Sequence, residues 1–333
     1  MITDCTASPE IYTRKQLRDM MAAFIPSSRI PRKLHIVTDT SDFFRVNYDD
    51  VIILNKRPFL IRNNKYEGRF GLDDQPKFWV KSAKDLLTGE SKIIKMVFYE
   101  KFTSNIGDLT FDCFRSPEKE ARILSLVKGH PNFMQGFSTN DSAGGIIRVL
   151  DYIPGTTICE YVLGLGNNHE DYFHNYFTSV LDDYIKLVEA IQFLHDHKEK
   201  HGDIRRDHII RDKKSGLYRW IDFDFNYTHK ENMFSYDLFG LGNILVYLTG
   251  RGDVTTYELE INNKRVFGSL SNDDRHIVFQ NRIVNLKKVY PYIPDLLNNI
   301  LLQFSAGANI FYDNTSQLIN DIKEAKENLG HDK

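Results

Sequence analysis

The sequence has 333 residues, enough to bury at least one sizeable core and more in keeping with two lobes than with one. A formal net charge of −2 excludes the global positive field that binders of nucleic acid and anionic membranes carry. Hydrophobic residues make up 41% of the chain, which excludes a disordered protein. We therefore expect a globular protein without a nucleic-acid or membrane partner.

The cysteines and the apolar stretches point to the compartment. Cys5, Cys113 and Cys159 are widely separated, so they form neither a disulfide framework nor a metal-ligand spacing, and they fit a reducing compartment. No apolar stretch approaches the roughly 18 residues of a membrane-spanning helix, and no signal peptide is visible at the N-terminus. We expect a soluble, cytoplasmic protein.

Residues 1–45 are the least readable part of the chain. A short helix is expected over 14–24, and Pro26 would end it. We interpret this segment as an N-terminal arm that packs on the fold. A regulatory or dimerisation segment is the alternative.

From Val51 the pattern becomes typical of β-structure. Short apolar runs at 51–55 and 58–62 precede two strands, expected over 77–83 and 91–98. The residues between these two strands, 87–90, form a turn with its glycine. Lys95 lies inside the second strand, where it either faces solvent or points into a site that uses its charge.

The next segment predicts a helix with a carboxylate on its buried face. Ser116 is its expected N-cap and Pro117 lies in its first turn. Glu120 falls at helical spacing on an apolar stripe, together with Ile123, Leu124 and Val127. An unpaired buried charge costs several kcal/mol, so Glu120 needs a cation. Lys95 is the nearest candidate upstream, and we predict a Lys95–Glu120 ion pair.

A strand over 146–153 follows, and we take it as the connection between the lobes. Residues 176–197 keep the helical period closely and predict a long amphipathic helix. This helix runs directly into the sequence His201-Gly202-Asp203. Asp203 and Asp222, the latter at the end of an aromatic, strand-like run, put carboxylates where a globular chain favours apolar residues.

The last third is predicted to be mainly helical. Residues 236–249 are apolar nearly all round, which is typical of a helix covered on every side. Asp237 at its start either caps this helix or braces a neighbouring loop. Residues 255–276 are expected to be irregular. Helices are expected around 278–289, 293–304 and 314–327.

Taken in order, these features resemble the eukaryotic-type protein kinase fold, in a variant found among bacterial kinase-like proteins. The resemblance covers roughly residues 77–322. The His-Gly-Asp form is also similar to small-molecule kinases such as aminoglycoside phosphotransferases. The resemblance implies an α+β, two-lobed fold: a small β-rich N-lobe with one regulatory helix over 46–153, and a larger, mostly helical C-lobe over 154–333.

The resemblance also implies roles in phosphoryl transfer, where positioning and charge neutralisation supply most of the catalysis. Lys95 would contact the α- and β-phosphates of ATP, held in place by Glu120. Asp222 would bind Mg²⁺. Asp203 would orient or deprotonate the acceptor hydroxyl, and Arg205 would steady the transferred phosphoryl group.

Two further sets of residues would bind the nucleotide. Main-chain groups around Asp151 and Ile153 would meet the adenine. Gly68 and Gly71 would form the loop over the phosphates, although their spacing departs from that of the family and an ordinary turn is the alternative.

Other departures concern the metal and the acceptor. His208 stands where the family has an asparagine metal ligand, and imidazole is a poor ligand for Mg²⁺. Asp224 replaces a glycine and is a candidate second metal ligand, as are His208 itself and Asp207. We expect a single firmly held Mg²⁺, or a preference for Mn²⁺. Asp237 follows Asp222 by only 15 positions, which leaves no room for the family's activation segment.

The sequence therefore predicts an ATP- and Mg²⁺-dependent phosphotransferase, similar to serine/threonine protein kinases. It would transfer the γ-phosphate to a hydroxyl on a protein or a small molecule. The alternative is a pseudokinase that acts as a nucleotide-binding or scaffolding module. Transfer of AMP has no specific support in the sequence.

Overall fold

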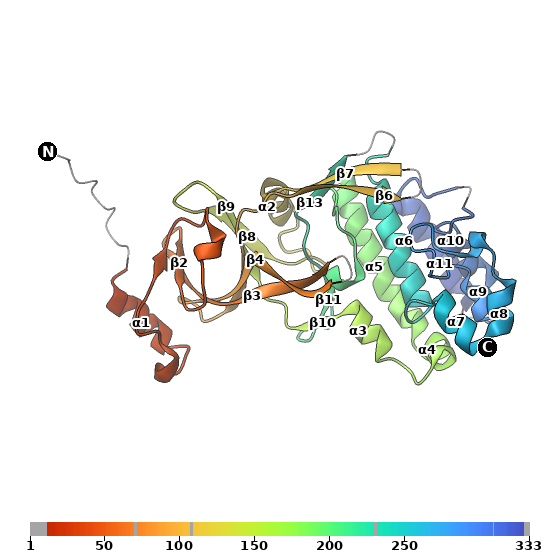
Figure 1. Ribbon diagram of the computed structural model, residues 1–333, viewed down its shortest axis with the longest axis horizontal. Helices are drawn as coiled ribbons and strands as arrows, with labels where there is room; N and C mark the ends of the chain where they lie inside the picture. The colour runs from red at the N-terminus through yellow and green to blue at the C-terminus, as the bar shows by residue number, and fades with distance from the viewer. Residues whose placement is uncertain (1–11, 70–71, 107–108, 229–231, 309, 330–333) are drawn as a thin grey trace. The chain divides into compact units, whose positions relative to one another are not determined.

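A computed structural model describes residues 12–69, 72–106, 109–228, 232–308 and 310–329 (Figure 1). The chain forms two compact units. The first unit comprises Met1–Tyr99, Glu120–Lys128 and Gln135–Tyr152, and the second comprises Glu100–Lys119, Gly129–Met134 and Ile153–Lys333. Together they contain both sheets and helices, so the protein is α+β. The boundaries expected for the arm and the two lobes, at residues 45 and 153, stay predictions.

The first unit is built on a seven-stranded sheet. Its strand order is β1-β2-β3-β4-β5-β9-β8, and every neighbouring pair is antiparallel except β1 with β2. The strands are β1 (Ile36–Val37), β2 (Val51–Leu54), β3 (Arg57–Arg69), β4 (Leu72–Asp85), β5 (Ser91–Lys95), β8 (Gly136–Asn140) and β9 (Ile146–Asp151).

The predicted hairpin is present as β4 and β5. Gly89 in its turn has a φ of 74°, a left-handed conformation that glycine adopts without a steric penalty. The register pairs Val80 with Lys95. Strand β5 ends at Lys95, three residues earlier than expected. The antiparallel pairing with β9 places Lys95 opposite Arg148.

Two apolar clusters form the core of the first unit. One gathers Phe59, Ile94 and Val149 with other buried strand residues. The other joins Leu17 and Met21 to Val51, Leu60 and Leu86. Because Leu17 and Met21 belong to helix α1 (Arg14–Ala22), the predicted N-terminal helix packs on the sheet.

The second unit contains most of the helices. Helices α5 (Phe177–Asp196) and α6 (Ser235–Thr249) lie side by side, and the Tyr184 hydroxyl donates to the Leu241 carbonyl at 2.6 Å (Figure 1). Both were predicted, and α6 is buried along most of its length. The others are α3 (Ile158–Leu163), α4 (His169–Asn175), α7 (Thr256–Asn262), α8 (Lys264–Ser269), α9 (Leu286–Val289), α10 (Asp295–Leu302) and α11 (Thr315–Leu329).

Two predictions in the last third are wrong. The stretch expected to be irregular contains α7 and α8, because the Thr255 and Asn263 side chains accept backbone N–H groups at their starts. The helix expected over 278–289 is confined to α9. The first half of the expected stretch forms a turn instead, because the His276 Nδ1 atom accepts from the amides of Val278 and Phe279, both at 3.0 Å.

Two small sheets of the second unit flank the candidate site. One consists of β10 (Gly155–Thr157), β11 (Ile209–Asp212) and β12 (Tyr218–Trp220). The other consists of β6 (Lys101–Ile106), β7 (Leu109–Arg115) and β13 (Phe225–Thr228), with β7 in the centre. Helix α2 (Pro117–Leu126) begins directly after β7, and Ser116 accepts from the Lys119 amide as its predicted cap.

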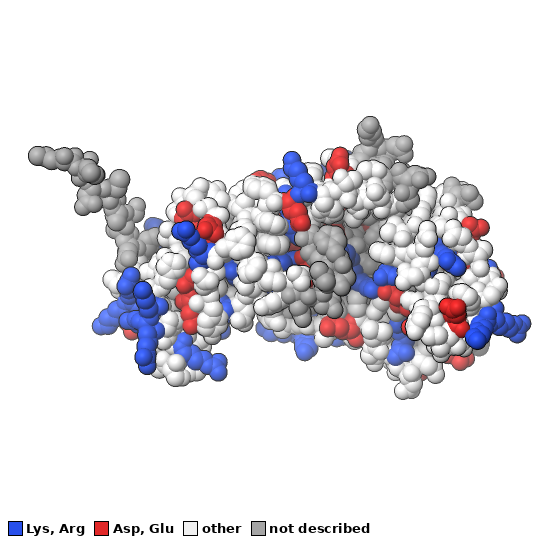
Figure 2. All heavy atoms as spheres, in the orientation of Figure 1, with Lys and Arg blue, Asp and Glu red and all other residues white. Residues whose placement is uncertain are grey.

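Acidic and basic side chains are intermixed over much of the face drawn in Figure 2, in line with the net charge of −2. Within the described ranges, no helix combines the length and apolar character needed to cross a bilayer.

Close packing of α6 against the last helices generates a test of this fold. A Cβ atom on Gly242 would lie 2.2 Å from the Phe304 ring, so we expect Gly242→Ala to lower the free energy of unfolding by about 1–3 kcal/mol. Gly268 in α8 has open space, and Gly268→Ala should leave stability unchanged or raise it by up to about 1 kcal/mol. Urea unfolding measures both. Equal effects would contradict the packing of α6.

Candidate active site

The loop that follows α5 carries Asp203 and requires a glycine before it. Gly202 has a φ of 89°, and a Cβ atom on it would lie 1.9 Å from the Phe225 carbonyl oxygen. No other residue fits this close approach. The sequence His201-Gly202-Asp203 therefore takes its form from the strand that begins at Phe225.

Asp237 fixes the position of this loop. Its fully buried carboxylate accepts the amide N–H groups of His201 at 2.8 Å and Gly202 at 2.9 Å. His195 Nε2 lies 3.1 Å from the same carboxylate. Burial acts to raise the pKa of Asp237, but the hydrogen bond with His195 and the neighbouring donors outweigh it and hold the pKa below the usual range. Since no side chain caps α6, the bracing alternative is the correct one.

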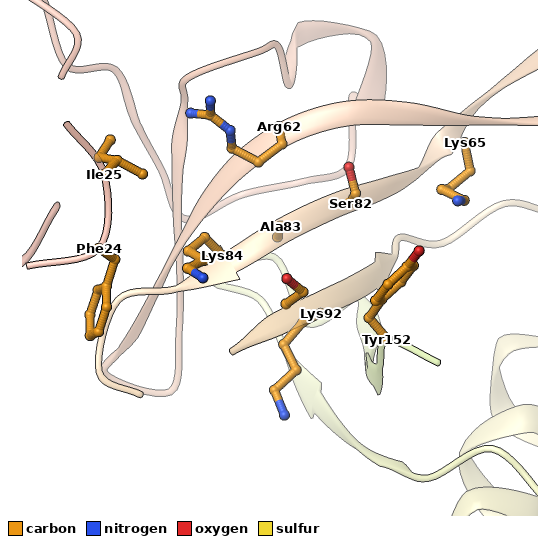
Figure 3. A pocket seen from close by; sticks show the side chains of 10 residues that line it. Phe24, Ile25, Arg62, Lys65, Ser82, Ala83, Lys84, Lys92 and Tyr152 are labelled. Atoms are coloured by element: carbon orange, nitrogen blue, oxygen red, sulfur yellow. The ribbon is translucent and has the colours of Figure 1, made fainter. Parts of the chain in front are cut away.

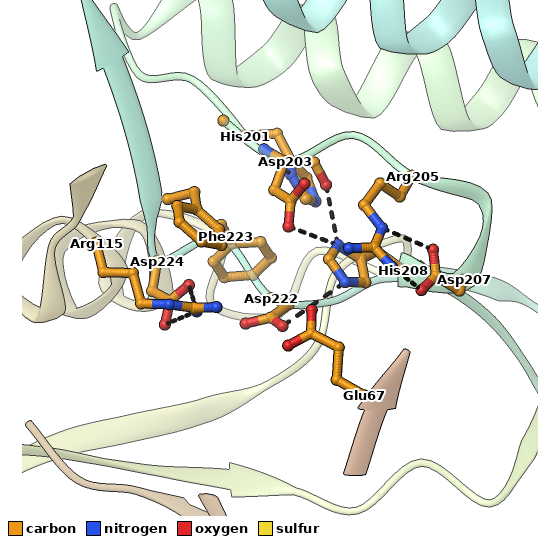
Figure 4. Close-up of polar contacts among 12 residues, drawn as sticks. Glu67, Arg115, His201, Asp203, Arg205, Asp207, His208, Asp222, Phe223 and Asp224 are labelled. Atoms are coloured by element: carbon orange, nitrogen blue, oxygen red, sulfur yellow. Dashed lines mark hydrogen bonds and ion pairs between the residues drawn. The ribbon is translucent and has the colours of Figure 1, made fainter. Parts of the chain in front are cut away.

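Asp203 and Asp222 lie on either side of His208 (Figure 4). His208 Nδ1 donates to the Asp203 main-chain carbonyl at 2.9 Å and lies 3.6 Å from its carboxylate. His208 Nε2 lies 3.7 Å from the Asp222 carboxylate. Burial raises the pKa of Asp203, and electrostatic interactions with His208 and Arg205 oppose that rise. One imidazole thus connects the two carboxylates singled out in the sequence.

The backbone at Asp222 is strained. Its φ of 66° lies in the left-handed region, which residues with a side chain seldom adopt. The Ile221 amide donates to the His208 carbonyl at 2.9 Å, so the chain enters this conformation directly from a contact with the other loop. Strain of this kind persists where the surroundings fix it, and it is common at functional sites.

Arg205 forms an ion pair within its own loop. Its guanidinium donates to both carboxylate oxygens of Asp207, at 3.0 and 2.5 Å. Burial acts to raise the pKa of Asp207, but His208 and Arg205 outweigh it and lower the pKa. The role predicted for Arg205 towards a phosphoryl group stays a prediction.

Asp224 has a partner that the sequence did not indicate. One terminal nitrogen of Arg115 donates to both carboxylate oxygens, at 2.9 and 3.0 Å, and both side chains are buried. The Arg115 guanidinium also lies over the Phe225 ring, 3.9 Å from its centroid. Arg115 lies 109 residues before Asp224, at the end of a hairpin with no recognised motif. This ion pair occupies the carboxylate expected to be a second metal ligand.

In the first unit, the predicted Lys95–Glu120 ion pair is present. The Lys95 ammonium donates to Glu120 Oε1 at 2.8 Å, and the two side chains are 4% and 0% exposed. Arg148 Nε donates to the other carboxylate oxygen at 3.0 Å. Arg148 was not predicted from the sequence, although it is a charged residue within the apolar run of β9.

The other residues predicted to bind the nucleotide are Asp151, Ile153, Gly68 and Gly71. Asp151 ends β9, and its carboxylate accepts from Lys92 at 2.6 Å. Ile153 belongs to the second unit and is half-buried. Gly68 lies in β3, whereas Gly71 is outside the described residues. Their roles towards ATP stay predictions.

A separate cavity of 380 Å³ opens in the first unit (Figure 3). Of its basic lining residues, Arg62 pairs with Asp49 and Lys92 pairs with Asp151. Lys65 and Lys84 lie near the rings of Tyr152 and Phe24. Its lining residues include no carboxylate, and none of them was predicted to be catalytic.

Within the part of the chain that the structure describes, no three His, Cys, Asp or Glu side chains form a ready-made metal cluster. Mg²⁺ is commonly held by one or two carboxylates together with substrate phosphates and water. Asp222, 3.7 Å from His208 Nε2, is a carboxylate that could serve in this way.

Comparison with known proteins yields relatives of one kind. No protein-family model matches the chain. The serine/threonine-protein kinase ppk25 of Schizosaccharomyces pombe is 25% identical over 155 residues, which is 46% of this chain and 33% of that protein. CBL-interacting protein kinase 33 of Oryza sativa is 25% identical over 41% of this chain and 27% of its own length. The human SNF-related serine/threonine-protein kinase is 25% identical over 44% of this chain and 17% of its own.

The chain thus spans about a third or less of the length of these relatives. All three are protein kinases, two of them serine/threonine-protein kinases by name, and their similarity supports the resemblance to the protein-kinase-like superfamily. The bacterial and aminoglycoside-phosphotransferase features stay predictions.

The brace formed by Asp237 predicts a change in stability. Asp237→Asn keeps the shape but leaves a buried amide N–H without its acceptor, and we expect a loss of about 1–3 kcal/mol in the free energy of unfolding. Because the folded pKa lies below 3.8, the stabilisation by the carboxylate is complete above about pH 4 and is lost as the pH falls below it. The difference between wild type and variant in urea unfolding should therefore shrink from pH 6 to pH 3. Exposed Asp196→Asn is the control, and an equal loss there would refute the brace.

Proposed function

We propose that the protein is a kinase-like phosphotransferase that transfers the γ-phosphate of ATP to a hydroxyl group. The observation that carries the proposal is the pair Asp203 and Asp222 on either side of His208, in loops fixed by Asp237. The kinase relatives support the same activity.

Each residue has a chemical role in this proposal. Asp203, whose pKa is raised, is suited to orient the acceptor hydroxyl and to take its proton. Asp222, with Asp203 nearby, would hold the metal, and the metal would neutralise charge on the phosphates. Lys95, fixed by Glu120, would bind the phosphates. Arg205 would steady the transferred group after it leaves Asp207.

We propose Mg²⁺ as the metal, with Mn²⁺ as the alternative. His208 supplies the reason for the alternative, because Nδ1 is engaged by the Asp203 carbonyl and Nε2 faces Asp222. Imidazole is a poor ligand for Mg²⁺, which prefers oxygen ligands.

The acceptor is a hydroxyl on a protein or on a small molecule. The serine/threonine-protein kinases among the relatives favour a serine or threonine in a protein. The short path from Asp222 to Asp237, which includes β13 and the start of α6, favours a small molecule. The cytoplasmic location stays a prediction.

A pseudokinase is the second candidate. The observation that favours it is the pairing of Asp224 with Arg115, which removes a carboxylate from the set of metal ligands. In that case the protein would bind nucleotide without transferring phosphate.

Labelled ATP tests the reaction. Wild type incubated with γ-labelled ATP and Mg²⁺ should transfer label, to itself or to added acceptors, and Asp203→Asn should reduce transfer by about 100-fold or more. Exposed Asp196→Asn should transfer at the wild-type rate. Nucleotide binding without transfer would establish the pseudokinase, and label from the α position would mean AMP transfer instead.

Two lysines of one strand test the phosphate site. Lys95→Ala should lower kcat/KM for ATP by about 100-fold or more, because a buried cation aimed at developing charge is lost. Lys92→Ala, on the opposite side of β5 and paired with Asp151, should change it less than about threefold. Equal losses in the two variants would show that the predicted role of Lys95 is wrong.

A further inference from the structure

Lys119, in the first turn of α2, is a buried cation whose ammonium donates hydrogen bonds to three main-chain oxygens. Only 1% of the residue is exposed. Its ammonium donates to the carbonyl oxygens of His201 at 2.7 Å and Phe223 at 3.1 Å, and also to that of Phe225. A buried ammonium is costly unless its three N–H groups are satisfied, and three carbonyls satisfy them all.

These carbonyls belong to the two loops of the candidate site. His201 precedes Asp203 by two residues, and Phe223 directly follows Asp222. One ammonium therefore joins the backbone that carries the proposed proton acceptor to the backbone that carries the proposed metal ligand. Burial lowers the pKa of Lys119 to about 8, and the nearby carboxylates of Asp237 and Asp224 oppose that fall.

Residues just before Lys119 in the sequence also bind the segment from Phe223 to Phe225. The Ser116 amide donates to the Asp224 carbonyl at 2.7 Å, and Arg115 binds the Asp224 carboxylate. Strands β7 and β13 pair with Arg115 opposite Phe225. Residues 115–119 thus contact the chain from Phe223 to Phe225 by strand pairing, an ion pair and the Lys119 hydrogen bonds.

We propose that Lys119 is a positioning residue, which sets the distance between Asp203 and Asp222 by holding both loops on one ammonium. This inference rests on the proposed phosphotransfer. It goes beyond that proposal, because it attributes the fixed conformation of the loop that carries Asp222 to residues at the start of α2. The next residue, Glu120, holds Lys95. Consecutive residues of α2 therefore fix the loops in one case and the phosphate-binding lysine in the other.

A positioning role differs from a general contribution to stability in what it changes. If Lys119 only filled space, a methionine of similar length would serve. If it sets the spacing of the loops, its loss should affect the step that needs both carboxylates. ATP binding through other groups should be spared. Misplacement by about 1 Å is enough to cost about 100-fold in rate.

The experiment compares Lys119→Met with Lys128→Met, the same change at an exposed position just beyond α2. We expect Lys119→Met to lower kcat by about 100-fold, raise the half-saturating Mg²⁺ concentration at least about tenfold, and leave KM for ATP within about threefold. Amide hydrogen exchange, followed by mass spectrometry, should quicken over residues 201–203 and 222–225 only. Lys128→Met should match wild type in every measurement.

An unchanged kcat and unchanged exchange in folded Lys119→Met would overturn the inference. If wild type itself transfers no phosphate, the proposed function fails, and exchange in the two loops still decides whether Lys119 holds them. If Lys119→Met does not fold, Lys119→Arg replaces it, because a planar guanidinium cannot direct three donors to the same carbonyls. A folded Lys119→Arg with wild-type kcat and exchange would also overturn the inference.

Discussion

The candidate site depends on one buried carboxylate, Asp237. Its two oxygens accept consecutive amides of the loop before Asp203, and this fixes the peptide planes on either side of His201. Gly202 can then pass within contact distance of the Phe225 carbonyl, where a Cβ atom would not fit. The position of Asp203 therefore follows from a carboxylate that was itself expensive to bury. His195 and the two amides offset that cost.

The other buried charges of the protein are compensated in the same local manner. In the second unit, Asp224 is matched by Arg115, and Lys119 is matched by carbonyl oxygens. In the first unit, Glu120 is shared by Lys95 and Arg148. Compensated charges of this kind are already oriented before a ligand arrives. An arrangement that needs little reorganisation suits phosphoryl transfer, in which positioning and electrostatics dominate.

The connection from Asp222 to Asp237 is where the chain departs most from the protein kinases it resembles. It is too short for an activation segment, yet the backbone after Asp222 is not left without support. Strand β13 pairs with β7 over Phe225–Thr228, and residues 115–119 bind the preceding turn. The β6–β7 hairpin, which lies earlier in the chain, thus fixes the conformation of the loop that carries Asp222.

Periodicity and the cost of burial were sufficient to predict α5, α6, the β4–β5 hairpin and the Lys95–Glu120 pair. Each of these depends on neighbours close in sequence or on a charge that must find a partner. The same reasoning failed at 255–289, where caps by Thr255 and Asn263 and a turn at His276 outweighed the apolar pattern. The spacing of Asp203 and Asp222 indicated the chemistry. It could not indicate how the two carboxylates are held.

Only the tertiary structure decided those supports. Arg115 binds a carboxylate 109 residues away, Lys119 binds main-chain oxygens 82 to 106 residues away, and Arg148 reaches Glu120 across 28 residues. No local pattern specifies such partners, because a buried cation in a sequence is equally compatible with any carboxylate or carbonyl that the fold brings near. The sequence by itself determined which residues are costly to bury. The fold determined which partners offset the cost of burying these residues, and so which of the residues are already oriented for catalysis.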